Sequence, residues 1–245
     1  MKITMHQSPD SQAGMTLIEI MIAMLIGAFL IGGVLQIFIN TKQTNRMVEN
    51  LSRVQENGRL ALDLLGRDIR MTSFWGCQTR PTGDIAGGND NAVNGDNIDN
   101  GTDNVTLKAA YATMPTGSCG TTVDKTTTYY TDPTSTIIYT INNAVLQKNT
   151  NNQTNGLIEG VENMQILYGE DNNDDGWANY YVPAGNVVNW EKVVSIRVSL
   201  LIRSLEDNLA ARPLAYTYNG ATTTATDRRL RRVFTSTFAI RNRLP

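Results

Sequence analysis

The chain has 245 residues, of which 41% are hydrophobic and 18% charged, a balance that suits one globular domain plus an additional segment. Its formal net charge of -2 gives no general reason to expect nucleic acid or anionic lipid as a partner. The single histidine is His6, and the sequence has no Cys-x-x-Cys pair, nucleophile elbow, Walker A loop or dinucleotide fingerprint. We therefore expect a protein that is not an enzyme, and an exported hydrolase is the weakest alternative.

The first predicted element is an apolar segment near the N-terminus. Between Ile20 and Ile39 only Gln36 is polar, and a helix of about 20 residues rises about 30 Å, the thickness of a bilayer's hydrocarbon core. A cleaved secretory signal carries its small-residue cleavage site after the apolar region, whereas Gly14 precedes it here. The segment also holds a carboxylate, Glu19, whose insertion into lipid costs roughly 3 kcal/mol. We predict a spanning helix that survives processing and in which Glu19 has a partner.

The order of these residues resembles the type IV prepilin motif. A short polar leader ends in Gly14, the residues MTLIE from Met15 to Glu19 follow, and the apolar helix comes next. The resemblance implies cleavage between Gly14 and Met15 by a prepilin peptidase, N-methylation of Met15, and a role for Glu19 in assembly. In that role Glu19 meets the charged N-terminus of a neighbouring subunit, a pairing that would set register more than affinity because desolvation cancels much of the attraction.

Two features depart from that motif. Most members of the family begin the mature chain with Phe rather than Met, and the leader here has one lysine, Lys2, balanced by Asp10. The alternative interpretation is an ordinary signal anchor.

A helical pattern continues beyond the apolar segment. Apolar residues recur at spacings of three, four or seven, with polar residues between them: Val48, Leu51, Val54, Ala61, Leu62, Leu65 and Ile69. Gly58 and Gly66 weaken this helix by about 1 kcal/mol each without ending it. We predict one helix over residues 16–71, roughly 80 Å long. A globular domain is expected to pack against its apolar stripe.

From residue 72 the composition changes to Asn, Thr, Gly and Asp, with a long surface loop expected over 89–104. Alternating patterns predict strands at 105–111, 136–141, 144–148, 161–168, 193–203 and 232–241. Asn142 and Asn143 are expected to form a two-residue hairpin turn, because asparagine tolerates positive φ. A helix followed by strands predicts an α+β fold, in which the second half of the helix packs against a mostly antiparallel sheet. The resemblance to prepilins implies that this is a type IV pilin-like fold.

The predicted organisation has four parts. Residues 1–14 form the leader, 15–40 the transmembrane and assembly helix, 41–72 its amphipathic continuation, and 73–245 a periplasmic β-rich domain. In that exported domain an intrachain disulfide between Cys77 and Cys119 is favoured, and two buried thiols are the alternative.

One loop motif has the oxygen chemistry of a cation site. Asp171, Asn173 and Asp175 occupy positions one, three and five of an EF-hand-like loop, with Gly176 at six. Position twelve is Val182 rather than the bidentate glutamate. A plain acidic turn is therefore favoured over calcium, and otherwise no cofactor is expected.

A basic block precedes the last predicted strand. It comprises Arg228, Arg229, Arg231 and Arg232, with no aromatic residue interleaved to stack on bases. We favour two interpretations of this block: a solvated strand edge, or an electrostatic interface with an acidic neighbouring subunit. We expect no direct binding of nucleic acid.

Several later segments, in order, are similar to the PilW family of minor pilins: RLALDLLGRDIRMTSFWGC, VENMQILYGEDNNDDGW, VVSIRVSLLIRS and RRVFTSTFAIRNRLP. The resemblance implies a low-copy subunit that joins other minor pilins to prime type IV pilus assembly, near the fibre tip, in support of adhesion, twitching motility or DNA uptake. It implies as partners the major pilin, the prepilin peptidase, an inner-membrane assembly platform and a tip adhesin. The chain would cross the inner membrane once, with its C-terminal domain in the periplasm, before it enters the fibre at the cell surface.

Two other functions share much of this evidence. A minor pseudopilin of type II secretion has every N-terminal feature described above. A membrane-tethered periplasmic binding module would keep its apolar segment uncleaved and would not need Glu19.

Overall fold

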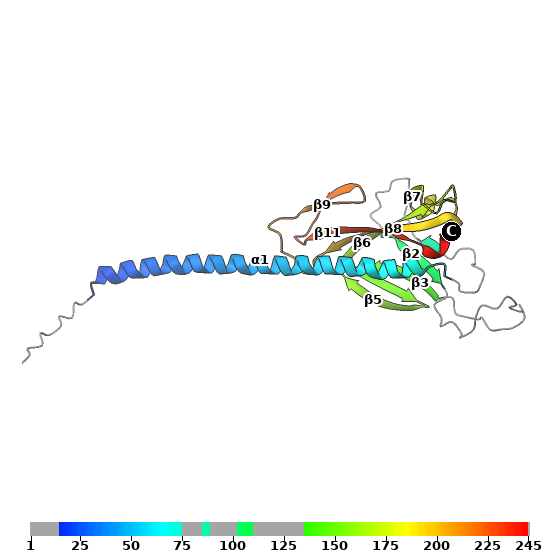
Figure 1. Ribbon diagram of the computed structural model, residues 1–245. Coiled ribbons are helices and arrows are strands. Elements are labelled where there is room, and N and C mark those ends of the chain that lie inside the picture. Colours follow the sequence, from blue (N-terminus) through cyan, green and yellow to red (C-terminus); the bar gives the residue numbers. More distant parts are fainter. Residues whose placement is uncertain (1–14, 75–84, 89–101, 110–134, 245) are drawn as a thin grey trace, which may run out of the picture. The chain divides into compact units, whose positions relative to one another are not determined.

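The computed structural model describes residues 15–74, 85–88, 102–109 and 135–244. The chain divides into two compact units, Met1–Arg46 and Met47–Pro245, and the boundary falls within one continuous helix, α1 (Leu17–Met71). The fold is α+β, a long N-terminal helix followed by antiparallel sheets, as predicted (Figure 1). The leader, including Gly14, the predicted loop up to residue 101, and Cys77 with Cys119 all lie outside the described residues, so the predictions for them are not tested.

Helix α1 begins and ends within one residue of the predicted bounds. Glu19 lies in its first turn and Arg70 in its last, and each charge has the sign that the helix dipole favours at that end. At the C-terminal end the side-chain amide of Asn242 donates to the Thr72 carbonyl at 2.9 Å. The end of the helix is thereby tied to the C-terminal segment of the chain.

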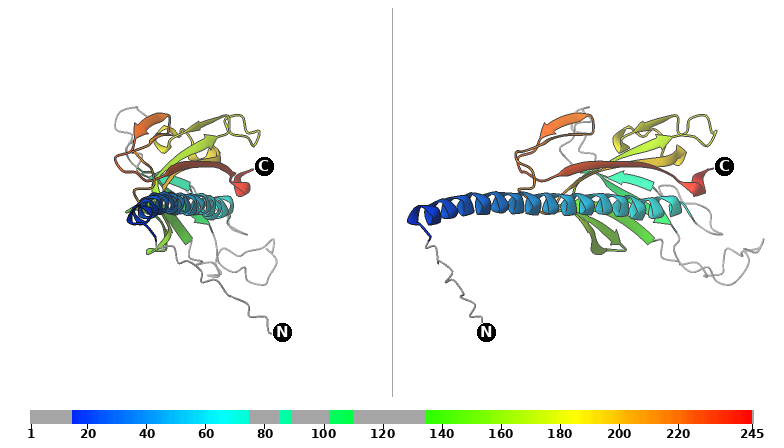
Figure 2. Two further views of the ribbon diagram at one scale, coloured as in Figure 1. Left: turned by 90° about the vertical axis from the view of Figure 1, so that its left-hand side faces the viewer. Right: turned by 60° about the vertical axis from the view of Figure 1, so that its left-hand side comes forward.

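The second unit contains two larger sheets and a small one. A five-stranded sheet has the order β1-β2-β3-β4-β5, a four-stranded sheet has the order β11-β8-β6-β7, and β9 pairs only with β10 among the described strands; every pairing is antiparallel. In Figures 1 and 2 the second half of α1 runs between the two larger sheets. The bounds of the strands are β1 Ile85–Gly88, β2 Asn104–Ala109, β3 Ser135–Asn142, β4 Val145–Thr150, β5 Gln153–Glu159, β6 Val161–Glu170, β7 Tyr180–Val182, β8 Val193–Arg203, β9 Ala215–Tyr218, β10 Ala221–Thr224 and β11 Arg231–Ala239. Short 3₁₀ helices lie at Ala184–Asn186, Trp190–Lys192 and Arg241–Arg243.

Tight turns with two residues at positive φ close three hairpins. The β3–β4 turn is Asn143-Ala144, with φ of 51° and 58°, and not the predicted pair Asn142-Asn143. Asn142 instead pairs with Val145 as the last residue of its strand. The other two turns are Asn151-Asn152 and Asn219-Gly220. Positive φ at both positions is the type I′ geometry that matches the twist of the strands, and asparagine is the first turn residue each time.

The core confirms the predicted alternation in the later strands. In β8 the residues Ile196, Val198 and Leu200 are fully buried, and in β11 the even-numbered Phe234 and Phe238 turn toward the core. The helix stripe needs a correction, because Val48 is 61% exposed and Leu51 37% exposed. The buried positions of α1 are Asn50, Val54, Gly58, Ala61, Leu65, Gly66, Asp68 and Ile69.

Candidate functional site

The first half of α1 is an exposed apolar surface with one carboxylate near its start. Every large apolar side chain between residues 15 and 39 is exposed, and the segment is long and apolar enough to cross a membrane. Glu19 is also exposed, and its backbone N–H donates to the Thr16 carbonyl at 3.1 Å in the opening turn. A surface of this kind is stable only in lipid or against other apolar helices. The predicted site residues Met15 and Glu19 therefore lie together at the beginning of this surface.

The second half of α1 is held in its domain by glycine–phenylalanine contacts. Phe234 and Phe238 of β11 lie over Gly58 and Gly66, and a Cβ placed on either glycine would come within 3.0 Å of the facing ring. The two glycines therefore allow the helix and β11 to approach closely. From the sequence alone, these glycines were expected only to weaken the helix.

A buried carboxylate adds a polar tie between α1 and the five-stranded sheet. Asp68, 7% exposed, accepts a hydrogen bond from the Tyr139 hydroxyl at 2.6 Å and one from the Lys148 ammonium at 2.5 Å. Tyr139 lies on β3 and Lys148 on β4. No sequence pattern predicted this site, because Asp68 is one of several charged residues near the end of the helix.

The acidic loop after β6 brings the three predicted calcium ligands together, and their side chains bond within the loop. Asp171 accepts backbone N–H bonds from Gly176 at 2.7 Å and Asn173 at 3.2 Å, while the Asn173 amide donates to Asp175 at 2.9 Å. Burial acts to raise the pKa of Asp171, but the backbone N–H groups of residues 173–176 together outweigh it and hold that pKa below its ordinary value.

Two neighbouring charges belong to the same loop. The Lys192 ammonium donates to Asp174 at 3.2 Å, and the fully buried Glu170 accepts from the Tyr180 hydroxyl and the Asn189 N–H. Within the described residues no group of three or more His, Cys, Asp or Glu side chains is arranged to hold a metal. Calcium remains a prediction that these contacts leave untested.

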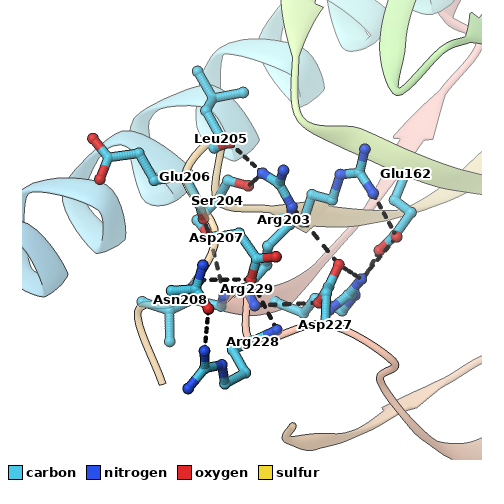
Figure 3. A network of polar contacts seen from close by, with 12 residues as sticks. Glu162, Arg203, Ser204, Leu205, Glu206, Asp207, Asn208, Asp227, Arg228 and Arg229 are labelled. Carbon is cyan, nitrogen blue, oxygen red and sulfur yellow. Dashed lines mark hydrogen bonds and ion pairs between the residues drawn. The ribbon is translucent and has the colours of Figure 1, made fainter. Parts of the chain in front are cut away.

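The arginine block takes part in an internal network at the start of β11 (Figure 3). Arg231, whose side chain is 7% exposed, bonds Glu162 at 2.7 Å and Asp227 at 2.6 Å. Arg229 donates to the carbonyls of Ser204, at 2.9 Å, and Leu205. The hydrogen bond from Arg231 lowers the pKa of Asp227 to about 2. The bonding partners of Arg229 and Arg231 thus belong to their own domain. For these two residues the predicted solvated edge and the predicted interface with another subunit are both wrong.

Comparison with known proteins gives two family matches. The family described as type IV pilus-assembly protein W matches residues 122–242, which include every strand from β3 to β11. The prokaryotic N-terminal methylation motif matches residues 9–35, which include Gly14, Met15 and Glu19. Among solved structures, a type IV-like pilin from Thermus thermophilus is similar at 16% identity, with a TM-score of 0.46 over 79% of this chain and 99% of that chain. No curated protein matches the sequence significantly.

Proposed function

This chain belongs to the PilW family of type IV pilus proteins, and on that premise we propose that it joins other minor pilins to prime pilus assembly at or near the fibre tip. The family match and the methylation motif make it a membrane-anchored minor pilin. The priming role, the position in the fibre, and the use of the pili in adhesion, motility or DNA uptake are our proposal.

The observation that carries the proposal is the contrast within α1. Its first half exposes a nearly continuous apolar surface around Glu19, whereas one face of its second half is buried among strands. Such a helix is suited to rest in the inner membrane, with its C-terminal domain in the periplasm, and then to exchange lipid for the helices of other subunits. Cleavage by a prepilin peptidase after Gly14 would supply the amine that Glu19 needs as a partner.

The proposed partners follow from that exchange. They are the other minor pilins and the major pilin in the fibre, the assembly platform in the inner membrane, and a tip adhesin. A structural subunit of this kind needs no catalytic centre.

We predict that Glu19→Ala leaves membrane insertion intact but lowers recovery of the chain in sheared pili at least tenfold. A factor of ten corresponds to about 1.4 kcal/mol, less than the cost of leaving one member of a buried ion pair without its partner. Immunoblots of the membrane and sheared-fibre fractions measure both quantities. Glu56→Ala is the matched control, because Glu56 is an exposed carboxylate on the same helix.

Equal recovery of the Glu19→Ala and Glu56→Ala chains in the fibre fraction would contradict the role of Glu19. A chain absent from pili altogether, combined with loss of protein secretion on its deletion, would favour the pseudopilin function instead.

A further inference from the structure

Strand β5 forms an edge of the five-stranded sheet that lacks protection over its first residues. It pairs with β4 on one side, and no described strand pairs with its other side. Its seven residues include no Lys, Arg or Pro, and its one charge, Glu159, is at the end. The other long edge, β11, carries the exposed Arg232, and β7 has three residues and is followed by Pro183. Charge, proline and short length are usual protections against strand addition. In β5 such protection is confined to its last residue, Glu159, whose carbonyl also accepts a hydrogen bond from the Asn57 side chain of α1.

The hairpin geometry identifies which backbone groups point outward. Thr150 and Gln153 close the two-residue turn as a hydrogen-bonded pair. Because hydrogen-bonded and non-hydrogen-bonded pairs alternate, Thr154 and Gly156 direct their N–H and C=O groups away from β4. Residues 153–156 are all exposed, and the register shifts only beyond Gly156. The regular part of the edge therefore presents two donors and two acceptors to a partner.

A groove of about 530 Å³ lies beside this edge, between β5 and α1. Leu60 of α1 and Leu205, 46% and 40% exposed, give it an apolar lining, and Arg53 and Asn57 supply polar groups. Backbone groups next to an apolar groove suit an extended peptide, which bonds through its main chain and inserts alternate side chains. Neither lipid nor a small solute offers that pattern.

We infer that the β5 edge binds an extended segment of a neighbouring pilin subunit as an added strand, with an apolar side chain of that segment against Leu60 and Leu205. The inference rests on the proposed function, since it requires the chain to be built into a fibre. Continuity of α1 supports it: under the proposed function the exposed apolar half of this helix packs against other subunits, and Arg53, Asn57 and Leu60 of the same helix line the groove.

The test compares prolines at two equivalent hairpin positions. Thr154→Pro removes one outward N–H of β5 and leaves the β4 ladder intact. Thr222→Pro makes the same change in β10. Thr222, like Thr154, directly follows the closing residue of a type I′ turn, and the hydroxyl of each forms a hydrogen bond with its cross-strand neighbour. Thr154→Ala controls for loss of the side chain.

With the full chain expressed beside the other pilins, Thr154→Pro should lower recovery in sheared fibres by about fivefold, the effect of one lost hydrogen bond. Thr222→Pro and Thr154→Ala should remain near wild type. Equal recovery of the two proline variants, whether high or low, would overturn the inference. Absence of the wild-type chain from fibres would instead overturn the proposed function.

A second measurement does not depend on the folding of the proline variants. A photo-crosslinking residue in place of the exposed Asn155 should form an adduct with another pilin in assembled fibres. Adducts confined to this chain itself would overturn the inference.

Discussion

At the scale of single residues, two glycines determine how the helix meets its domain. Gly58 and Gly66 are buried under Phe234 and Phe238, so the absence of a side chain lets the rings of β11 reach the helix. Helix propensity alone would favour alanine at both positions by about 1 kcal/mol. Packing against the rings reverses that preference.

We predict that Gly66→Ala destabilises the second unit by about 1 to 2 kcal/mol, because overpacking against Phe238 exceeds the gain in helix propensity. Denaturant unfolding of the full chain in detergent measures the change. Gly185→Ala is the control, because a Cβ there meets nothing within 4 Å. Combining Gly66→Ala with Phe238→Leu should recover part of the loss, and a Gly66→Ala chain more stable than wild type would contradict this account.

At the scale of elements, the sequence was informative where one period persisted over many residues. The helix and β8 were predicted closely, because apolar residues repeat at helical spacing in one and alternate in the other. Strands β1, β5, β7, β9 and β10 were missed. Four of them have only three or four residues, and the first four residues of β5 are polar or glycine and exposed, so none presents a long alternation of apolar residues.

The candidate site was likewise predictable only where it depends on a local sequence pattern. Met15 and Glu19 belong to a short local motif, so the sequence alone suffices to propose them as site residues, and their roles stay predictions. The bonds from Asp68 to Tyr139 and Lys148 join residues about 70 to 80 positions apart, and no local pattern encodes such a meeting. Arg231 was misinterpreted for the same reason, since Glu162, one of its partners, lies 69 residues earlier.

The network at the start of β11 makes stability depend on pH. Asp227 has a pKa of about 2 in the folded chain, below its ordinary 3.8, so its ion pair stabilises the fold above about pH 4 and is lost as pH falls toward 2. We predict that the stability difference between wild type and Asp227→Asn is largest at neutral pH and shrinks between pH 4 and 2.

Urea unfolding across this pH range measures that difference. Repeating the comparison in an Arg231→Met background should give a smaller difference, since Arg231 is the principal cause of the lowered pKa. A difference that stayed constant from pH 7 to 2 would show that Asp227 does not act through its charge.

At the scale of the whole molecule, one helix serves two environments. The large apolar side chains of its first half are exposed, while its second half shares a core with the sheets. This is what a subunit needs if it is anchored by lipid first and by other helices afterwards.

The central claim is that this chain is a processed subunit of a pilus, and mass spectrometry of the sheared fibre fraction tests it most directly. We predict that the first peptide begins with N-methylated Met15 and that the chain is present at far lower copy number than the major pilin. Chains that retain residues 1–14 in cells with active prepilin peptidase, and that stay in the membrane fraction, would contradict the claim.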